Sequence, residues 1–167
     1  YACKQPVSLY PALQWWIIPG NHDSLAAETL WSRIREQAPD NVHLLEDVEP
    51  VEIEAGVFVL HAPLPRRYPG RDLTSHMRGC DTDPRAFRIG LAHGSIQGFG
   101  SEHRASIEIA PDRPKLAGLS YLALGDWHGV REIGARAAYC GTPEPDGFLD
   151  NAQGFALLIA LEGADAP

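Results

Sequence analysis

Residues 15–24 constrain this chain more than any other stretch, because an apolar run there leads directly into three chemically reactive side chains. The sequence is Trp-Trp-Ile-Ile-Pro-Gly-Asn-His-Asp-Ser. A short apolar run that ends in Pro-Gly and is followed by a helix-capping residue is typical of a junction between a strand and a helix. In α/β sheets, ligands bind at the carboxyl ends of strands. We therefore expect Asn21, His22 and Asp23 to stand at a functional edge of a sheet.

The three side chains after this strand suit metal-assisted acid–base chemistry. The Asn21 amide oxygen is a neutral, hard ligand for a divalent metal, and His22 can donate a proton to a leaving oxygen. Asp23 can accept a hydrogen bond from the other ring nitrogen of His22 and so fix its tautomer. The alternative is a plain turn with an Asn cap and a surface His, so the tripeptide needs partners elsewhere in the chain.

Length and composition are those of an ordinary globular domain. The chain has 167 residues, of which 44% are hydrophobic and 22% are charged, and we expect a single domain over 1–167. No run approaches the ~20 apolar residues of a membrane span, so we expect no membrane association. The net charge of −8 argues against a large basic surface for duplex DNA. Bound metal ions could still create a local cationic site.

The cysteines indicate a reducing compartment. Cys3, Cys80 and Cys140 have neither paired spacing nor the spacing of metal ligands. We therefore expect no disulfide framework and a cytoplasmic location.

Hydrophobic periodicity predicts an α/β chain with several short strands. A helix is expected over 24–38, capped by Asp23 or Ser24 and ended by Pro39. Its buried stripe is predicted to contain Ala26, Leu30, Ile34 and Ala38, widened by Trp31. Strands are predicted over 15–19, 41–45, 51–54, 57–60, 87–92, 107–109, 121–124, 137–140 and 155–161, with a hairpin over 51–60. Single helical turns are expected within 73–77 and 111–119.

The segment 62–85 is the longest irregular stretch and the most basic one. Its arginines are Arg66, Arg67, Arg71, Arg78 and Arg85. A loop that contacts phosphate is one interpretation. A solvated loop is the favoured interpretation, because Asp72, Asp81 and Asp83 are interleaved with the arginines. His61, just before this segment, is interpreted as a polar residue at the end of a strand.

Three predicted strands end in one pattern, which is an apolar run, then Gly or His-Gly, then a polar ligand. The pattern yields Asn21, His93, and the pair Asp126 and His128. If the backbone of Asp126-Trp127-His128 is extended, its outer side chains point to one side. Imidazole, carboxylate and amide donors suit Mn, Fe or Zn better than Ca. Hydrolysis by a metal-activated water is the chemistry that such a set favours.

The order of these motifs resembles the calcineurin-like metallophosphoesterase superfamily. The resemblance rests on Gly20-Asn21-His22-Asp23, His93-Gly94 and Gly125-Asp126-Trp127-His128, and it covers the chain from about Trp15 onward. The segment Tyr139-Cys140-Gly141-Thr142-Pro143-Glu144-Pro145 is similar to the DNA-repair exonuclease branch, the nuclease-subunit type of the bacterial SbcCD complex. The resemblance implies a four-layer α-β-β-α sandwich with mixed sheets. It also implies a site for two divalent metal ions, with Mn expected and Fe or Zn as alternatives.

The resemblance implies a role for each matched residue. Asn21 and His93 would bind the second metal, and His128 would bind the first. Asp126 stands where the family's Gly-His-x-His motif has its first His, and its carboxylate is expected to bind the second metal as well. His22 would be the proton donor, with Asp23 behind it. In such a domain a hydroxide that bridges the metals attacks phosphorus and hydrolyses a phosphodiester or phosphomonoester bond.

Two further motifs of the family have no counterpart here. Asp-x-His and Gly-Asp-x-x-Asp precede the Gly-Asn-His-Asp motif in the family, and neither occurs in residues 1–19. They supply most ligands of the first metal and the bridging carboxylate. A permuted chain that opens at Asp126-Trp127-His128 is rejected, because no Gly-Asp-x-x-Asp follows. The simplest interpretation is a C-terminal portion that lacks the first strands, binds at most one metal well and is poorly active alone.

Three functions remain open at this point. The first is a metallophosphoesterase of the DNA-repair exonuclease type, with nucleic acid as substrate and an ATPase subunit as partner. The second is a phosphodiesterase for nucleotides or small molecules, which the acidic charge favours. The third is a non-catalytic scaffold or binding domain that has lost the first metal site.

Overall fold

A mixed sheet of six strands forms the centre of the computed structural model, which describes residues 12–83, 85–98, 108–144, 154 and 156–162. The strand order is β3-β4-β5-β8-β10-β9. The strands are β3 (Val51–Glu54), β4 (Val57–Ala62), β5 (Phe87–His93), β8 (Tyr121–Gly125), β10 (Ala137–Cys140) and β9 (Val130–Glu132). The four inner strands are parallel, and the edge strands β3 and β9 are antiparallel to their neighbours. The carboxyl ends of β4, β5 and β8 therefore meet at one edge.

A separate β-α-β unit forms the N-terminal part of the described chain. Strands β1 (Trp15–Ile17) and β2 (Val42–Leu44) pair in parallel, and helix α2 (Glu28–Gln37) connects them. The Trp16 and His43 rings stack with centroids 4.0 Å apart, on neighbouring strands. A third, small sheet pairs β6 (Ser95–Ile96) with β7 (Glu108–Ile109).

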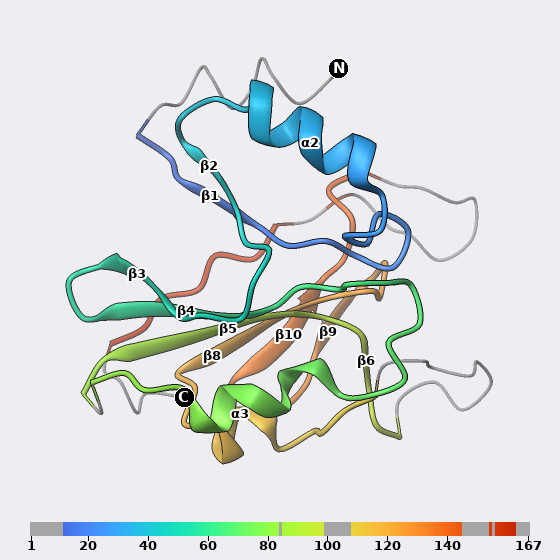
Figure 1. The fold of residues 1–167 in the computed structure, drawn as a ribbon. Coiled ribbons are helices and arrows are strands. Elements are labelled where there is room, and N and C mark those ends of the chain that lie inside the picture. The colour runs from blue at the N-terminus through green and yellow to red at the C-terminus, as the bar shows by residue number, and fades with distance from the viewer. Residues whose placement is uncertain (1–11, 84, 99–107, 145–153, 155, 163–167) are drawn as a thin grey trace.

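These elements lie in successive layers. Figure 1 shows β1, β2 and α2 on one side of the six-stranded sheet. The 3-10 helix η1 (Leu73–Gly79) and the short helix α3 (Arg113–Leu116) lie on the other side. The main core lies between the sheet and this second side, and it includes Leu60, Met77, Ile109, Leu119 and Leu122, each fully buried. The chain is therefore an α/β protein with a mixed sheet and few helices.

The predicted end of helix α2 is correct, but its predicted start is wrong. The helix begins at Glu28, and Ala27 precedes it without a side-chain cap, so the predicted cap by Asp23 or Ser24 is wrong. The reason is that residues 25–26 form a turn, held by a 2.8 Å hydrogen bond from the Leu25 N–H to the Leu64 carbonyl. At the other end, Ala38 is extended (ψ 147°), as expected for a residue before proline.

The predicted buried stripe of this helix is only partly correct. Trp31 is buried at 3% exposure, whereas Leu30 is 42% exposed and Ala26 is also exposed. The indole N–H of Trp31 donates to the backbone carbonyls of Asp23 and Ser24, at 2.8 and 2.9 Å. This bond turns the helix so that Trp31, and not Leu30, faces inward.

Most predicted strands and both predicted helical turns are present. The hairpin is confirmed as β3 and β4, and the turns are confirmed as η1 and α3. Two strands, β6 and β9, escaped prediction. The strand predicted over 155–161 is wrong for the part that the structure describes, because residues 156–161 pair with no other strand there, and Leu158 is 98% exposed. An apolar run forms a strand only where a neighbouring strand offers hydrogen bonds.

His61 lies inside a strand and not at its end. Strand β4 continues through Ala62, and His61 is fully buried. Its Nε2 lies 3.4 Å from Asp47 Oδ1, but neither ring nitrogen makes a hydrogen bond within the described residues. Burial lowers the pKa of this imidazole, and the nearby Asp47 carboxylate opposes the shift only in part.

Candidate metal-binding site

The candidate site forms where two neighbouring strands of the large sheet end beside the loop that follows β1. Strands β5 and β8 are parallel, and His93 at the end of β5 pairs in register with Gly125 at the end of β8. Asp126 follows Gly125 directly, so it emerges beside His93. The loop 20–24 brings Asn21 to the same place from the other sheet. Of the four side chains predicted to converge, Asn21, His93 and Asp126 meet at this edge, whereas the side chain of His128 does not join them.

The Asp126 carboxylate is the centre of this group. Its Oδ1 accepts a 3.1 Å hydrogen bond from Asn21 Nδ2, and His93 Nε2 lies 3.5 Å from the same oxygen. Its Oδ2 accepts a 2.9 Å hydrogen bond from Ser95 Oγ. Interaction with His93 lowers the pKa of Asp126, and the Ser95 hydrogen bond lowers it further, against the effect of burial. The carboxylate therefore stays ionised in the range where a metal ion binds.

The backbone at Asp126 is strained. Its φ of 111° lies in a region that side-chain-bearing residues rarely adopt, and it has the only positive φ among the described residues other than glycine. The segment Asp126-Trp127-His128 is therefore bent, and the prediction that it is extended is wrong. Such strain costs on the order of 1–3 kcal/mol and is common at functional sites. Here the bend directs the carboxylate toward His93 and Asn21.

Two glycines fix the position of the His93 ring. A Cβ added at Gly20 would lie 2.9 Å from Cε1 of His93, and one added at Gly125 would lie 3.0 Å from its Nδ1. The ring therefore fits between two backbone segments that leave no room for a side chain. The Asn21 N–H lies 3.3 Å from His93 Nε2 and donates to it, which requires the tautomer whose lone pair is on Nε2.

A buried tyrosine supports the turn between His93 and Ser95. The Tyr139 hydroxyl donates to the Gly94 carbonyl at 2.7 Å and accepts from the Ile96 N–H at 3.0 Å. Burial raises the pKa of Tyr139 to about 12, so its hydroxyl keeps its proton. Tyr139 and Ser95 are functional-site residues that sequence reasoning did not assign. Their contacts depend on the order of β5, β8 and β10 in the sheet, which no local pattern reveals.

His22 and Asp23 do not form the pair that the sequence predicts. The Asp23 carboxylate accepts a 2.7 Å hydrogen bond from the Gly20 N–H, which closes the loop on itself. Among the described residues no hydrogen bond joins Asp23 to His22, whose side chain is exposed. Asp23 therefore shapes the loop, and the exposed His22 is accessible to a ligand. The acid role of His22 stays a prediction.

His128 lies near this group, but none of the hydrogen bonds or ion pairs described above includes its side chain. Its side chain is exposed, and its charge lowers the pKa of Asp126 through space. Its backbone carbonyl accepts a 3.0 Å hydrogen bond from the Thr142 N–H. Gly141 has a φ of 73°, and a Cβ there would lie 2.8 Å from the His128 carbonyl oxygen. The first residues of the segment 141–145 thus hold the backbone of His128 in place.

The group at the sheet edge has donor atoms for one divalent metal ion, but the Asn21 amide must rotate before its oxygen can bind. Within the described residues, no three His, Cys, Asp or Glu side chains form a group that could hold a metal. The group at the sheet edge has one imidazole, one carboxylate and one amide. Asn21 now presents its NH₂ to Asp126, and a half-turn of the amide about its last bond would present its oxygen instead. His93, Asp126 and Asn21 would then offer the nitrogen and oxygen donors that Mn, Fe or Zn accept.

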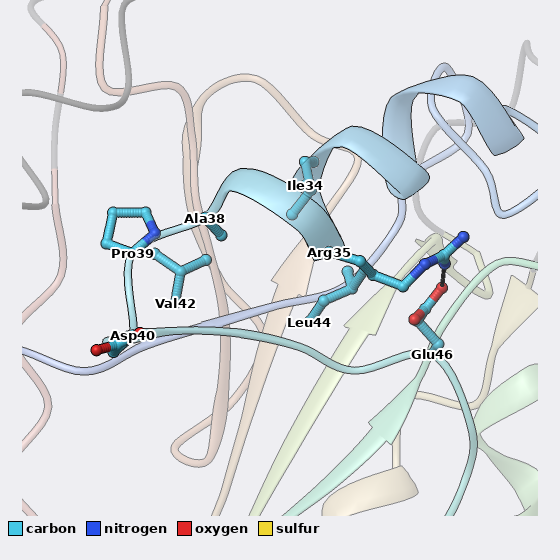
Figure 2. A pocket seen from close by; sticks show the side chains of 8 residues that line it. All are labelled: Ile34, Arg35, Ala38, Pro39, Asp40, Val42, Leu44 and Glu46. Carbon is cyan, nitrogen blue, oxygen red and sulfur yellow. Dashed lines mark hydrogen bonds and ion pairs between the residues drawn. The ribbon is translucent and has the colours of Figure 1, made fainter.

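A depression lies beside α2, away from the candidate site. It is lined by Ile34, Arg35, Ala38, Pro39, Asp40, Val42, Leu44 and Glu46. Figure 2 shows the ion pair between Arg35 and Glu46 at one side of it. Its lining is aliphatic apart from three charged side chains, and two of these neutralise one another. It contains none of the residues that the sequence predicts for function.

Comparison with known proteins does not identify a family. No protein-family model matches the chain, and no curated protein matches it significantly. The helices in the described part of the chain are all too short or too polar to cross a membrane. The function is therefore inferred from the geometry of the site and from the motifs that form it.

Proposed function

We propose that this chain carries part of the active site of a metal-dependent phosphoesterase of the calcineurin-like kind. The observation that supports this proposal is the contact of Asn21, His93 and Asp126. These residues lie far apart in the sequence, as the 72 and 105 positions between Asn21 and its two partners show. Side chains that meet at the carboxyl ends of parallel strands are typical of ligand sites in α/β proteins.

Each residue has a defined task in this proposal. His93 Nε2, Asp126 Oδ1 and the Asn21 amide would hold one divalent metal, with Mn expected. A metal bound there would act as a Lewis acid on a phosphoester and would lower the pKa of a bound water. Ser95 and Tyr139 hold the carboxylate and the turn in place. His22, exposed at the loop tip, would give a proton to the departing alkoxide.

The three donors can hold one metal ion but not the two that a domain of this kind uses. A catalytic divalent-metal site holds its ion with three protein ligands and needs an open position for substrate. His128 lies near enough to act on Asp126 electrostatically and would complete a second site only together with further ligands. We therefore expect the 167-residue chain to bind one metal ion and to hydrolyse phosphoesters slowly.

Hydrolysis of an aryl phosphodiester with added Mn²⁺ tests this proposal. We expect slow, Mn²⁺-dependent turnover that Asp126→Asn abolishes. Asn at this position tolerates the strained φ better than most residues, so the variant should fold. We also expect His22→Asn to lose turnover while metal content is unchanged, since His22 binds no metal in the proposal.

The matched control is Asp112→Asn, at an exposed carboxylate before α3 that makes no cap hydrogen bond. Turnover equal in wild type and Asp126→Asn would contradict the proposal. Metal binding without any turnover would instead support the scaffold function.

A further inference from the structure

A basic and aromatic segment begins close to the candidate site. We name residues 65–71 the basic lip. Arg66, Arg67, Tyr68 and Arg71 are all exposed, and Tyr68 is 61% exposed. The Arg67 guanidinium carbon lies 5.4 Å from the centroid of the Tyr68 ring, so the cation rests over the ring. The lip thus combines three cations with a large exposed aromatic ring.

The cations of the lip are not neutralised by the acidic residues that are interleaved with them in sequence. Asp72 pairs instead with Arg113 of α3 at 2.6 Å and accepts from the Thr74 N–H at 2.8 Å. Asp83 accepts from the Arg85 N–H at 2.8 Å. Across the part of the chain that the structure describes, no ion pair involves Arg66, Arg67 or Arg71. The three arginines are therefore exposed and unpaired among the described residues, which fits a solvated loop and also leaves their charges available to an anionic ligand.

The lip is anchored beside the site. Leu64 is fully buried, and its carbonyl accepts the 2.8 Å hydrogen bond from the Leu25 N–H, just beyond Asp23. Ala62 pairs in register with Ala92, the neighbour of His93. Figure 1 shows the chain after β4 running next to the loop between β1 and α2. The buried Pro69 and the paired Asp72 fix the far end.

We propose that the basic lip binds a single strand of nucleic acid and leads it into the site of Asn21, His93 and Asp126. This inference rests on the proposed function, because it names the substrate of that site. Guanidinium groups bind phosphates, and an exposed aromatic ring stacks on a base of any identity. The residues from Leu64 to Tyr68 span at most about 14 Å, so a strand of a few nucleotides can reach both places.

A strand fits the lip better than the other anionic ligands do. A lone phosphomonoester or small phosphodiester carries too few phosphates to engage the three arginines of the lip. A membrane surface would require an apolar face, and the exposed lip offers one aromatic ring among cations. The net charge of −8 disfavours any wide anionic surface, whereas a single strand needs only a narrow track of cations.

The test is fluorescence anisotropy with a labelled single-stranded oligonucleotide of about 15 nucleotides in EDTA, at about 50 mM salt. The combined variant Arg66→Gln, Arg67→Gln, Arg71→Gln is compared with a charge-matched control. The control carries Arg33→Gln, Arg78→Gln and Arg85→Gln, which alter three exposed arginines outside the lip. Tyr68→Ala is tested separately.

The lip variant should bind at least about tenfold more weakly than wild type, and the control should stay within about twofold. The slope of log K against log salt should fall by about 2, since each phosphate contact of a single strand contributes about 0.7. Tyr68→Ala should weaken binding about tenfold with an unchanged slope. Equal binding by the lip variant and wild type, or equal losses in the lip variant and the control, would overturn the proposal.

Binding to vesicles that contain phosphatidylserine tests a membrane surface as the alternative ligand of the lip. Loss of vesicle binding in the lip variant, with oligonucleotide binding retained, would assign the lip to membranes and overturn the proposal. Because binding is measured without metal, its result is independent of turnover. If the chain is inactive but binds oligonucleotide through the lip, the lip inference is supported and the proposed function is not. If the chain hydrolyses the aryl phosphodiester but its oligonucleotide binding does not depend on the lip, the proposed function is supported and the lip inference is not.

Discussion

The Tyr139 hydroxyl donates a 2.7 Å hydrogen bond to the carbonyl oxygen of Gly94, past the one strand (β8) that separates β10 from β5 in the large sheet. The same hydroxyl accepts from the Ile96 N–H at 3.0 Å. One side chain from β10 therefore holds both ends of the turn that follows His93. This buried contact thus supports the turn beside the candidate site.

Tyr139→Phe tests this support. The change removes one oxygen and leaves a buried carbonyl and a buried N–H without their partner. Each such loss costs about 1–3 kcal/mol, so we expect the free energy of unfolding to fall by roughly that amount or somewhat more. Urea denaturation followed by circular dichroism measures it. An unchanged denaturation midpoint would mean that the turn is held by other contacts.

Gly20→Ala tests the close approach at His93. The new Cβ would lie 2.9 Å from Cε1 of His93 and 3.1 Å from Asp23 Oδ1, so the ring or the loop must move. We expect a loss of about 1–3 kcal/mol in stability, as is usual for overpacking, together with weaker Mn²⁺ binding.

The matched control for this prediction is Gly79→Ala. No atom lies within 4 Å of a Cβ at that position, so the control should keep the stability and Mn²⁺ affinity of wild type. Equal Mn²⁺ affinity in Gly20→Ala and wild type would show that the His93 ring does not take part in binding.

The lowered pKa of His61 predicts a specific pH dependence of the free energy of unfolding. Burial holds its pKa in the folded protein below 6.5, although Asp47 partly opposes this, and the nearby His76 lowers the pKa further. Below pH 6.5 the unfolded chain therefore takes up a proton that the folded chain does not. Stability is fully present above pH 6.5 and falls as the pH is lowered toward the folded pKa, by at most about 1.4 kcal/mol per unit.

His61→Leu should remove this component. The variant should be about as stable as wild type near neutral pH, because it replaces a buried ring without hydrogen bonds by an apolar side chain. Between the folded pKa and pH 6.5 its stability should decline less steeply than that of wild type. Parallel profiles for the two proteins would mean that His61 titrates alike in the folded and unfolded chain.

The sequence allowed the position of the central site residues to be predicted, because position after a strand end is a local property. Asn21, His93 and Asp126 each follow an apolar run, and parallel strands bring such positions together. The bend at Asp126 was not predictable, since its φ of 111° is imposed by tertiary contacts. The pairing of Asp23 with Gly20 in place of His22 depends likewise on the closed shape of the loop.

The parts of the fold that escaped prediction share a physical cause. Strand β9 is exposed along its whole length, so it has no alternation of apolar and polar residues to reveal it. Helix α2 begins late because Leu25 bonds to Leu64, a residue distant in sequence. The apolar run at 156–161 has the composition of a strand, but a strand also needs a neighbouring strand for its backbone hydrogen bonds, and composition does not show whether one is present. The supporting roles of Ser95 and Tyr139 depend on strand order, which is a non-local property.

Titration of the chain with Mn²⁺, followed by electron paramagnetic resonance, tests most directly whether Asn21, His93 and Asp126 hold a metal ion together. We predict one bound Mn²⁺ per chain in wild type, at least about tenfold weaker binding in Asp126→Asn, and unchanged binding in Asp112→Asn. Wild-type binding that is absent, or that Asp126→Asn leaves intact, would contradict a shared metal site of these three residues.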